Sequence, residues 1–279
     1  MPKVSGHRFV KPFATFTFGN KAEHHAGMEM TGKNVAQGIP EAEFPAMAKH
    51  LRALGFEVEL VDLSAAPLKH GQEERLPPAC VLVVRHALQT MAAREGGDAP
   101  HVLHPKTFLE KTMELPWDRK FLNKRPGKNY DKVLNKQARY NLVFDGEGSE
   151  ANYEKGRGTV VAFRDFAPLE YLRRQLPSLF GPSTKDLVAE GNLYFDSSKC
   201  GIGFHGDGER RVVVAVRLGE SSPLHYRWYK KTNTISEDVR LVLDAGDMYV
   251  MSEKAVGHDW KKQLIPTLRH AAGKSYVCK

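Results

Sequence analysis

Cysteine is scarce in this 279-residue chain, which contains only Cys80, Cys200 and Cys278. Their odd number and the absence of a Cys-x-x-Cys pair argue against a disulfide framework and against a zinc knuckle. Long apolar runs are also missing, and the first residues lack the apolar stretch of a secretory signal. We therefore expect an intracellular protein, cytoplasmic or nuclear, that does not enter a membrane.

The chain has no acidic excess: its 41 Lys and Arg residues outnumber its 33 Asp and Glu residues, for a net charge of +8. Such a charge attracts polyanions, because Lys and Arg displace counterions from nucleic acid, but charge alone does not identify a partner. The hydrophobic content of 41% is near the average for globular proteins, so we expect a well-formed core rather than disorder.

The first hundred residues alternate helical and strand patterns. Spacing and alternation of apolar residues predict helices over 40–54 and 87–93 and strands over 56–61 and 80–84. Polar and turn-forming residues at 94–100 indicate a boundary. We therefore divide the chain into an N-terminal α/β unit, residues 1–105, and a larger domain, residues 106–279.

The larger domain is rich in short apolar or alternating segments. Strands are predicted over 140–144, 159–163, 191–195, 201–204, 211–218, 224–229, 239–243, 248–251 and 268–278, with one helix over 168–179. Many short strands at this spacing indicate an α+β fold built on a sandwich or double-sheet roll.

A cationic segment with interleaved aromatic residues runs from Trp117 to Tyr140 and includes Lys124, Arg125 and Lys128. It can follow a phosphate backbone, or it can be a solvated connection whose aromatic residues anchor it to the domain. Both interpretations remain open from the sequence.

The sharpest local motif is His205-Gly206-Asp207, flanked by further glycines at the end of a predicted strand. Residues two apart in an extended segment face the same side, so the imidazole and the carboxylate can converge on one ion. A His-x-Asp motif by itself is common and also occurs in turns stabilised by the Asp side chain.

His258 and Arg269 follow the predicted strand 248–251 and complete a constellation with this motif. Two His and one carboxylate leave open positions on a non-haem Fe(II) ion, and an Arg fork suits the carboxylate of 2-oxoglutarate. Tyr194 and Asn192 can add neutral hydrogen bonds. His270 and His225 are interpreted as bystanders, because His270 points opposite to Arg269 along its strand.

The segment from Arg139 to Lys274 resembles the AlkB-like 2-oxoglutarate and Fe(II) dioxygenases. The resemblance rests on ordered motifs: Asn192-Leu193-Tyr194, His205-Gly206-Asp207, the strand Val213 to Gly219, the strand Leu243 to Met251, His258 and Arg269. A second Arg that the family carries six residues after the first is Ser275 here.

The resemblance implies a double-stranded β-helix, or jelly-roll, core that holds Fe(II) through His205, Asp207 and His258. It implies that 2-oxoglutarate is bound by Arg269, Tyr194 and Asn192, and that O2 is used to oxidise a C–H bond. The family oxidises methyl groups on nucleobases, so DNA or RNA is the expected partner, with contacts from Lys124, Arg125, Lys128 and Arg210.

Two alternatives remain beside oxidation of a nucleobase. The same iron centre can hydroxylate a protein side chain or a small molecule. A nucleic-acid-binding protein can also retain the oxygenase fold without its chemistry, although the complete set of His205, Asp207, His258 and Arg269 argues against that reading.

Overall fold

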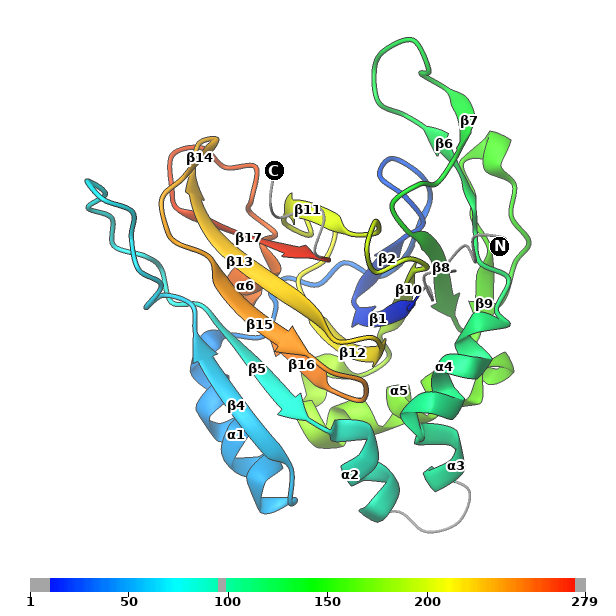
Figure 1. Ribbon diagram of the computed structural model, residues 1–279, viewed down its shortest axis with the longest axis horizontal. Coiled ribbons are helices and arrows are strands. Elements are labelled where there is room, and N and C mark those ends of the chain that lie inside the picture. Colours follow the sequence, from blue (N-terminus) through cyan, green and yellow to red (C-terminus); the bar gives the residue numbers. More distant parts are fainter. Residues whose placement is uncertain (1–10, 95–98, 274–279) are drawn as a thin grey trace, which may run out of the picture.

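Two β-sheets face each other in the computed structural model, which describes residues 11–94 and 99–273 (Figure 1). The larger sheet has eight strands, in the order β4 (Glu57–Asp62), β5 (Cys80–Arg85), β16 (Met248–Met251), β12 (Val213–Gly219), β1 (Phe13–Gly19), β10 (Val188–Tyr194), β8 (Tyr140–Asp145) and β9 (Val160–Ala162). The smaller has five: β11 (Ile202–His205), β17 (Thr267–Ala272), β13 (Ser222–Lys230), β14 (Asn233–Thr234) and β15 (Val239–Leu243).

Helices cover the outer face of the larger sheet (Figure 1). They are α1 (Phe44–Ala53), α2 (Ala87–Arg94), α3 (Ala99–Leu103), α4 (Pro105–Met113) and α5 (Ala167–Phe180). Alternate residues of each strand, such as Phe16 and Phe18 of β1, pack against Leu51, Phe108 and Leu172 of these helices. This packing forms the main core.

The inner face of the larger sheet packs against the smaller sheet at one end. Val213 and Tyr249 of the larger sheet share a second core cluster with Tyr226, Trp228 and Leu268 of the smaller sheet. Because side chains alternate along each strand, every strand that contributes to this cluster presents its other residues to the helices or to solvent. At the other end, the inner faces line a pocket.

Smaller elements complete the chain. The hairpins β2 (Lys21–Glu23) with β3 (Met30–Gly32), and β6 (Lys120–Asn123) with β7 (Lys132–Asn135), lie outside both sheets, and α6 (Glu253–Val256) precedes β17. Within the described residues, no helix is long and apolar enough to cross a membrane.

The predicted α+β class is confirmed, with strands predominating. The predicted helix 168–179 corresponds to α5, and the predicted strands 239–243 and 248–251 to β15 and β16. The predicted last strand, 268–278, ends earlier as β17, and its final residues lie outside the described part of the chain. No strand was predicted at β1, which lies in the middle of the larger sheet.

The boundary near residue 105 does not separate two sheets. β1 pairs with β10 and β12, and β5 pairs with β16, so strands from residues 1–105 and 106–279 hydrogen-bond in one sheet. Local sequence patterns indicate strands but not their pairing partners, which explains why the N-terminal segment looked like a separate unit.

Substitution of Phe16 tests this shared core. Phe16 is completely buried among Phe108, Trp117, Phe144 and Phe166, and we expect Phe16→Ala to lower the free energy of unfolding by about 3–5 kcal/mol. Urea unfolding followed by tryptophan fluorescence measures this, because every Trp lies after residue 105.

Val35→Ala, at an exposed site, serves as the control and should change stability by less than about 0.5 kcal/mol. If Phe16→Ala left the fluorescence transition in place, residues 1–105 would unfold independently and the two-unit division would hold.

Candidate metal centre and pocket

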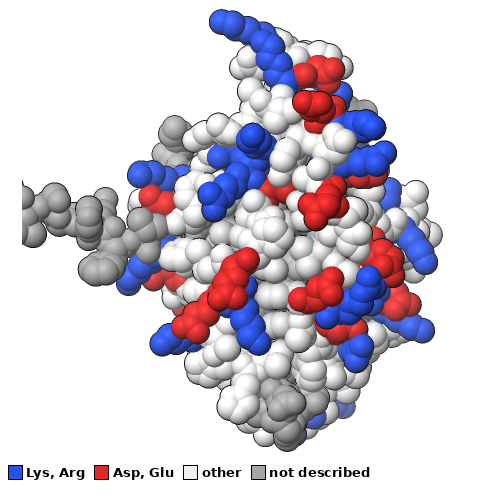
Figure 2. All heavy atoms as spheres, turned by 90° about the vertical axis from the view of Figure 1, so that its right-hand side faces the viewer, with Lys and Arg blue, Asp and Glu red and all other residues white. Residues whose placement is uncertain are grey.

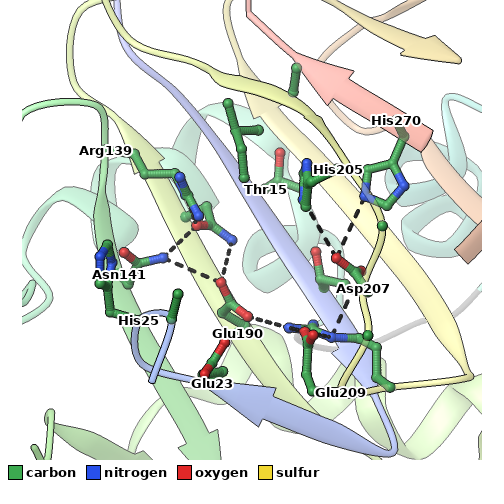
Figure 3. A pocket seen from close by; sticks show the side chains of 18 of the residues that line it. Thr15, Glu23, His25, Arg139, Asn141, Glu190, His205, Asp207, Glu209 and His270 are labelled. Carbon is green, nitrogen blue, oxygen red and sulfur yellow. Dashed lines mark hydrogen bonds and ion pairs between the residues drawn. The ribbon is translucent and has the colours of Figure 1, made fainter. Parts of the chain in front are cut away.

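A pocket of about 850 Å³ lies between the two sheets, where they diverge. The larger sheet contributes inward residues of β1, β10 and β12, such as Thr15, Asn192 and Arg217. The smaller sheet contributes His205 at the end of β11 and His270 on β17. Figure 3 shows these walls facing one another across the pocket.

Close backbone packing positions the His205-Gly206-Asp207 turn. The amide of Asp207 donates to the carbonyl oxygen of Val256 over 3.0 Å. A Cβ atom on Gly206 would lie 2.2 Å from the carbonyl oxygen of Gly257 and 2.6 Å from Cβ of Trp260, so only glycine permits this approach. The turn is therefore held against the segment that follows α6.

Three potential metal ligands converge at this turn: His205, Asp207 and His270, whose ligand atoms all lie within 4.8 Å of one another. Nε2 of His205 and Nε2 of His270 are 3.5 Å and 3.6 Å from Oδ1 of Asp207 (Figure 3). Two imidazoles and one carboxylate on one side of an ion make the donor set of non-haem Fe(II) sites and leave other positions open.

The protonation of these groups suits a cation. Nδ1 of His205 lies 2.8 Å from the carbonyl oxygen of Gly203, which can only accept, so Nδ1 donates this bond and Nε2 is the ring nitrogen that faces Asp207. Burial raises the pKa of Asp207, but the charge of Arg210, together with the neighbouring imidazoles, outweighs burial and holds the pKa well below its usual range. Asp207 is therefore an ionised ligand.

His258 lines the same pocket but is not part of the cluster. Its Nδ1 lies 3.1 Å from the carbonyl oxygen of Arg210. The structure thus corrects the sequence-based ligand set, in which His258 completed the triad and His270 was set aside. His270 pairs directly opposite His205 across the β11–β17 ladder, which places both rings on the pocket side.

Arg269 points away from the pocket, as strand alternation next to His270 requires. Its guanidinium lies 4.1 Å from the ring centroid of Tyr229 and 5.3 Å from that of Trp260, and Nη2 donates to the carbonyl oxygen of Lys231. Arg269, the predicted anchor for 2-oxoglutarate, therefore does not line this pocket. Ser275 lies outside the described residues.

Tyr194 and Asn192, which we predicted to hydrogen-bond 2-oxoglutarate, both line the pocket. The carboxamide oxygen of Asn192 accepts from Nε of Arg139 and from Nδ2 of Asn141, and its nitrogen donates to Glu190 over 3.1 Å. These bonds fix the Asn192 side chain beside Arg139, Asn141 and Glu190, the polar residues on this side of the pocket.

Arg210, which we predicted to contact nucleic acid, is buried and pairs with carboxylates instead of facing solvent. Its side chain is 4% exposed and pairs with Glu190, with Glu209 at 2.8 Å and with Asp207 at 3.8 Å. Burial raises the pKa of Glu190, but Arg210 and Arg139 outweigh it and lower that pKa. The sequence did not indicate this network, because Arg210 directly precedes a predicted apolar strand and charged residues at such positions usually face solvent.

The cationic segment forms the β6–β7 hairpin, which projects from the top of the molecule (Figure 1). Lys124, Arg125 and Lys128 are exposed, and Arg125 also lines the pocket. Figure 2 shows Lys and Arg at the upper tip of the molecule, where this hairpin lies, and mixed charges over the rest of that face. Aromatic anchoring occurs as well, because Trp117 is buried and the ring of Phe121 contacts His25.

Sequence reasoning missed several pocket residues, among them Arg217 and Glu23. Arg217 is completely buried in the apolar strand β12 and faces the pocket, and a charged residue within such a run was the available signal. Glu23 lies across the pocket, where burial and then the neighbouring Glu209 and Glu190 raise its pKa to about 7. No sequence pattern linked β2 to the site.

Comparison with known proteins identifies a viral relative. No model of a known protein family matches the chain. The uncharacterized protein R156 of Acanthamoeba polyphaga mimivirus is 38% identical over 266 residues, which span 95% of this chain and 96% of that protein. The similarity therefore covers the strands, the pocket and the hairpin together.

Proposed function

We propose that this chain, which belongs to the same family as mimivirus protein R156, is a non-haem Fe(II) dioxygenase that uses 2-oxoglutarate. The observation that carries the proposal is the cluster of His205, Asp207 and His270 at the wall of a large pocket. The relative is uncharacterized, so the argument depends on the site itself.

The arrangement of the sheets supports the proposal. Two facing sheets, antiparallel except for the edge pair β8 and β9, enclose a pocket between their inner faces, which is the arrangement of a double-stranded β-helix, or jelly-roll, core. β11, β17, β13 and β15 belong to one sheet, while β10, β1, β12 and β16 belong to the other. The two imidazoles lie on the paired strands β11 and β17, so their separation is set by backbone hydrogen bonds, and Asp207 lies in the turn that follows β11.

Fe(II) bound at this cluster would supply O2 activation for oxidation of a C–H bond. His205 and His270 would present neutral nitrogens, and Asp207 one negative charge. Arg210 compensates the buried charge of Asp207 and Glu190, which keeps the carboxylate oriented whether or not metal is bound. The remaining pocket, lined by Glu23, Asn141 and Arg139, holds the rest of the reactants.

A nucleobase in DNA or RNA is the preferred substrate within this proposal. The exposed cations of the β6–β7 hairpin lie beside the pocket, where they can bind a phosphate backbone while one base enters. A protein side chain or small molecule is the second candidate, because polar wall residues such as Asn141 and Glu190 also suit other polar groups.

Turnover of 2-oxoglutarate tests the proposal. Purified protein supplied with Fe(II), O2 and 2-oxoglutarate should release succinate. Adding oligonucleotide, peptide and metabolite pools in turn should show which class of substrate stimulates this release. Stimulation by oligonucleotides supports the nucleobase substrate, and stimulation by peptides or metabolites supports the second candidate. Absence of Fe(II) binding, or of succinate release with every pool, would leave the third reading, a nucleic-acid-binding protein without this chemistry.

We expect nucleic-acid binding to depend on salt through the hairpin. Replacing Lys120, Lys128 and Lys132 by Gln should flatten the log–log dependence of affinity on salt by about 0.9 per lost contact on duplex and about 0.7 on single strands. These side chains are exposed on β6, β7 and their connecting loop. Fluorescence anisotropy of a labelled oligonucleotide at several salt concentrations measures the slope.

The matched control replaces three exposed lysines on the helical layer, Lys49, Lys106 and Lys111, by Gln. It makes the same change in net charge but should leave the slope nearly unchanged. Equal effects of the two triple variants would mean that the hairpin has no specific role and that only net charge matters.

A further inference from the structure

Arg217 is a buried cation that forms no ion pair with any carboxylate of the described residues, unlike Arg210, the other arginine deep in the pocket. Its side chain is 1% exposed, and both Nε and Nη1 lack a hydrogen-bond partner among the described residues. Arg210, also buried, has Glu190, Glu209 and Asp207 around it. A buried guanidinium with free donors is costly unless an anion binds it.

Strand alternation and pairing direct the side chain of Arg217 towards the pocket. Val214, Val216 and Leu218 of β12 pack in the helix-facing core, so Arg217 faces the space between the sheets, where it lines the pocket. One face of its guanidinium lies 4.8 Å from the ring centroid of Phe13. The strand pairing places it beside Thr15 of β1, which also lines the pocket.

The adjacent pocket wall suits the chain of an organic acid. Ile202, Leu224 and Ala272 contribute apolar surface, and Tyr194 and Tyr249 contribute phenols. Burial raises the pKa of both phenols, so they remain neutral and can donate hydrogen bonds. An aliphatic segment fits this lining better than the hydrated shell of an inorganic anion does.

We infer that Arg217 binds the terminal carboxylate of a short-chain organic acid, the group that completes this end of the pocket. The identity of the acid as a 2-oxo acid that also reaches the His205, Asp207 and His270 cluster rests on the proposed function. Binding of the carboxylate itself does not, because Arg217 needs no metal to hold an anion. The cation that binds the carboxylate is thus Arg217 on β12, in the larger sheet, and not Arg269 on β17.

Direct binding tests this assignment without turnover. Glutarate, a dicarboxylate without the 2-oxo group, and 2-oxoglutarate are titrated calorimetrically into metal-free protein and into protein loaded with Mn(II). We expect Arg217→Met to weaken both acids about 10- to 100-fold, the effect of losing a charge-assisted hydrogen-bonding pair. Arg164→Met, which removes an exposed arginine outside the pocket lining, should change binding less than threefold.

The ligand-free stability provides an independent readout. Removing an uncompensated buried charge while keeping its volume should leave the melting temperature of Arg217→Met equal to or above that of the unmodified protein. A purely structural arginine would instead lower it. This result also shows that the variant is folded.

Three outcomes would overturn the inference: unchanged glutarate affinity in Arg217→Met, equal competition by inorganic phosphate, or a lower melting temperature with unchanged binding. Failure of the proposed function gives a different result. If glutarate binding depended on Arg217 but the protein released no succinate, the carboxylate site would be supported and the dioxygenase activity would be excluded.

Discussion

His270→Ala should abolish Fe(II) binding, whereas His258→Ala should retain it. His270 presents Nε2 to the same oxygen of Asp207 as His205 does, but His258 bonds the carbonyl of Arg210 outside the cluster. Removing a direct ligand should cost more than the roughly 10- to 100-fold that loss of an orienting partner costs. Calorimetric titration of Fe(II) under argon measures both variants.

Succinate release should follow the metal, being lost in His270→Ala and retained at least in part in His258→Ala. Far-UV circular dichroism provides the control for folding, since His270 is largely buried on β17. The opposite pattern, with metal lost in His258→Ala and kept in His270→Ala, would restore the ligand set expected from the sequence.

Arg210→Met should destabilise the protein by about 3–5 kcal/mol, because it leaves buried Glu190 without its cation. Urea unfolding at neutral pH measures the change. The adjacent Arg211 is the matched control: its pair with Glu253 is about one-third exposed, so Arg211→Met should cost at most about 1 kcal/mol. Equal effects would show that the carboxylate network contributes little.

The same pair predicts an acid dependence. Arg210 and Arg139 outweigh the effect of burial and lower the pKa of Glu190 below its ordinary value of 4.5. A depressed folded-state pKa contributes stability that is present above the unfolded value and is lost as pH falls through the folded value. The difference between Arg210→Met and the unmodified protein should therefore shrink below about pH 4.5.

The sequence-based site and the structure differ on which of two neighbouring residues of β17 faces the pocket. His270 and Arg269 are neighbours on a strand, so only one of them can face the pocket, and the sequence interpretation selected Arg269. That choice excluded His270 and required His258 as the second imidazole. The sequence does not show which face of β17 is turned inward, because Leu268 and His270 are set inward only by pairing with β11 and β13.

The sequence also did not predict which side chains lie next to Arg217 and Arg210, for a related reason. Arg217 is anchored beside Thr15, some two hundred residues earlier in the chain, through the β1–β12 ladder. The sequence placed Arg210 at the start of a strand, as for a surface cation. In the structure it is buried and pairs with Glu190 on β10. Such neighbours become visible only when strands distant in sequence pair.

What the sequence determined by itself was local: the α+β class, the helix α5, strands such as β15 and β16, and the His205-Gly206-Asp207 turn. Hydrophobic periodicity and turn residues act over a few positions, so they suffice for these features. Only the tertiary structure decided that β1 completes the larger sheet, that His270 joins the metal cluster and that Arg217 faces the pocket. Those features depend on strand pairing and register, which long-range packing selects and local pattern does not encode.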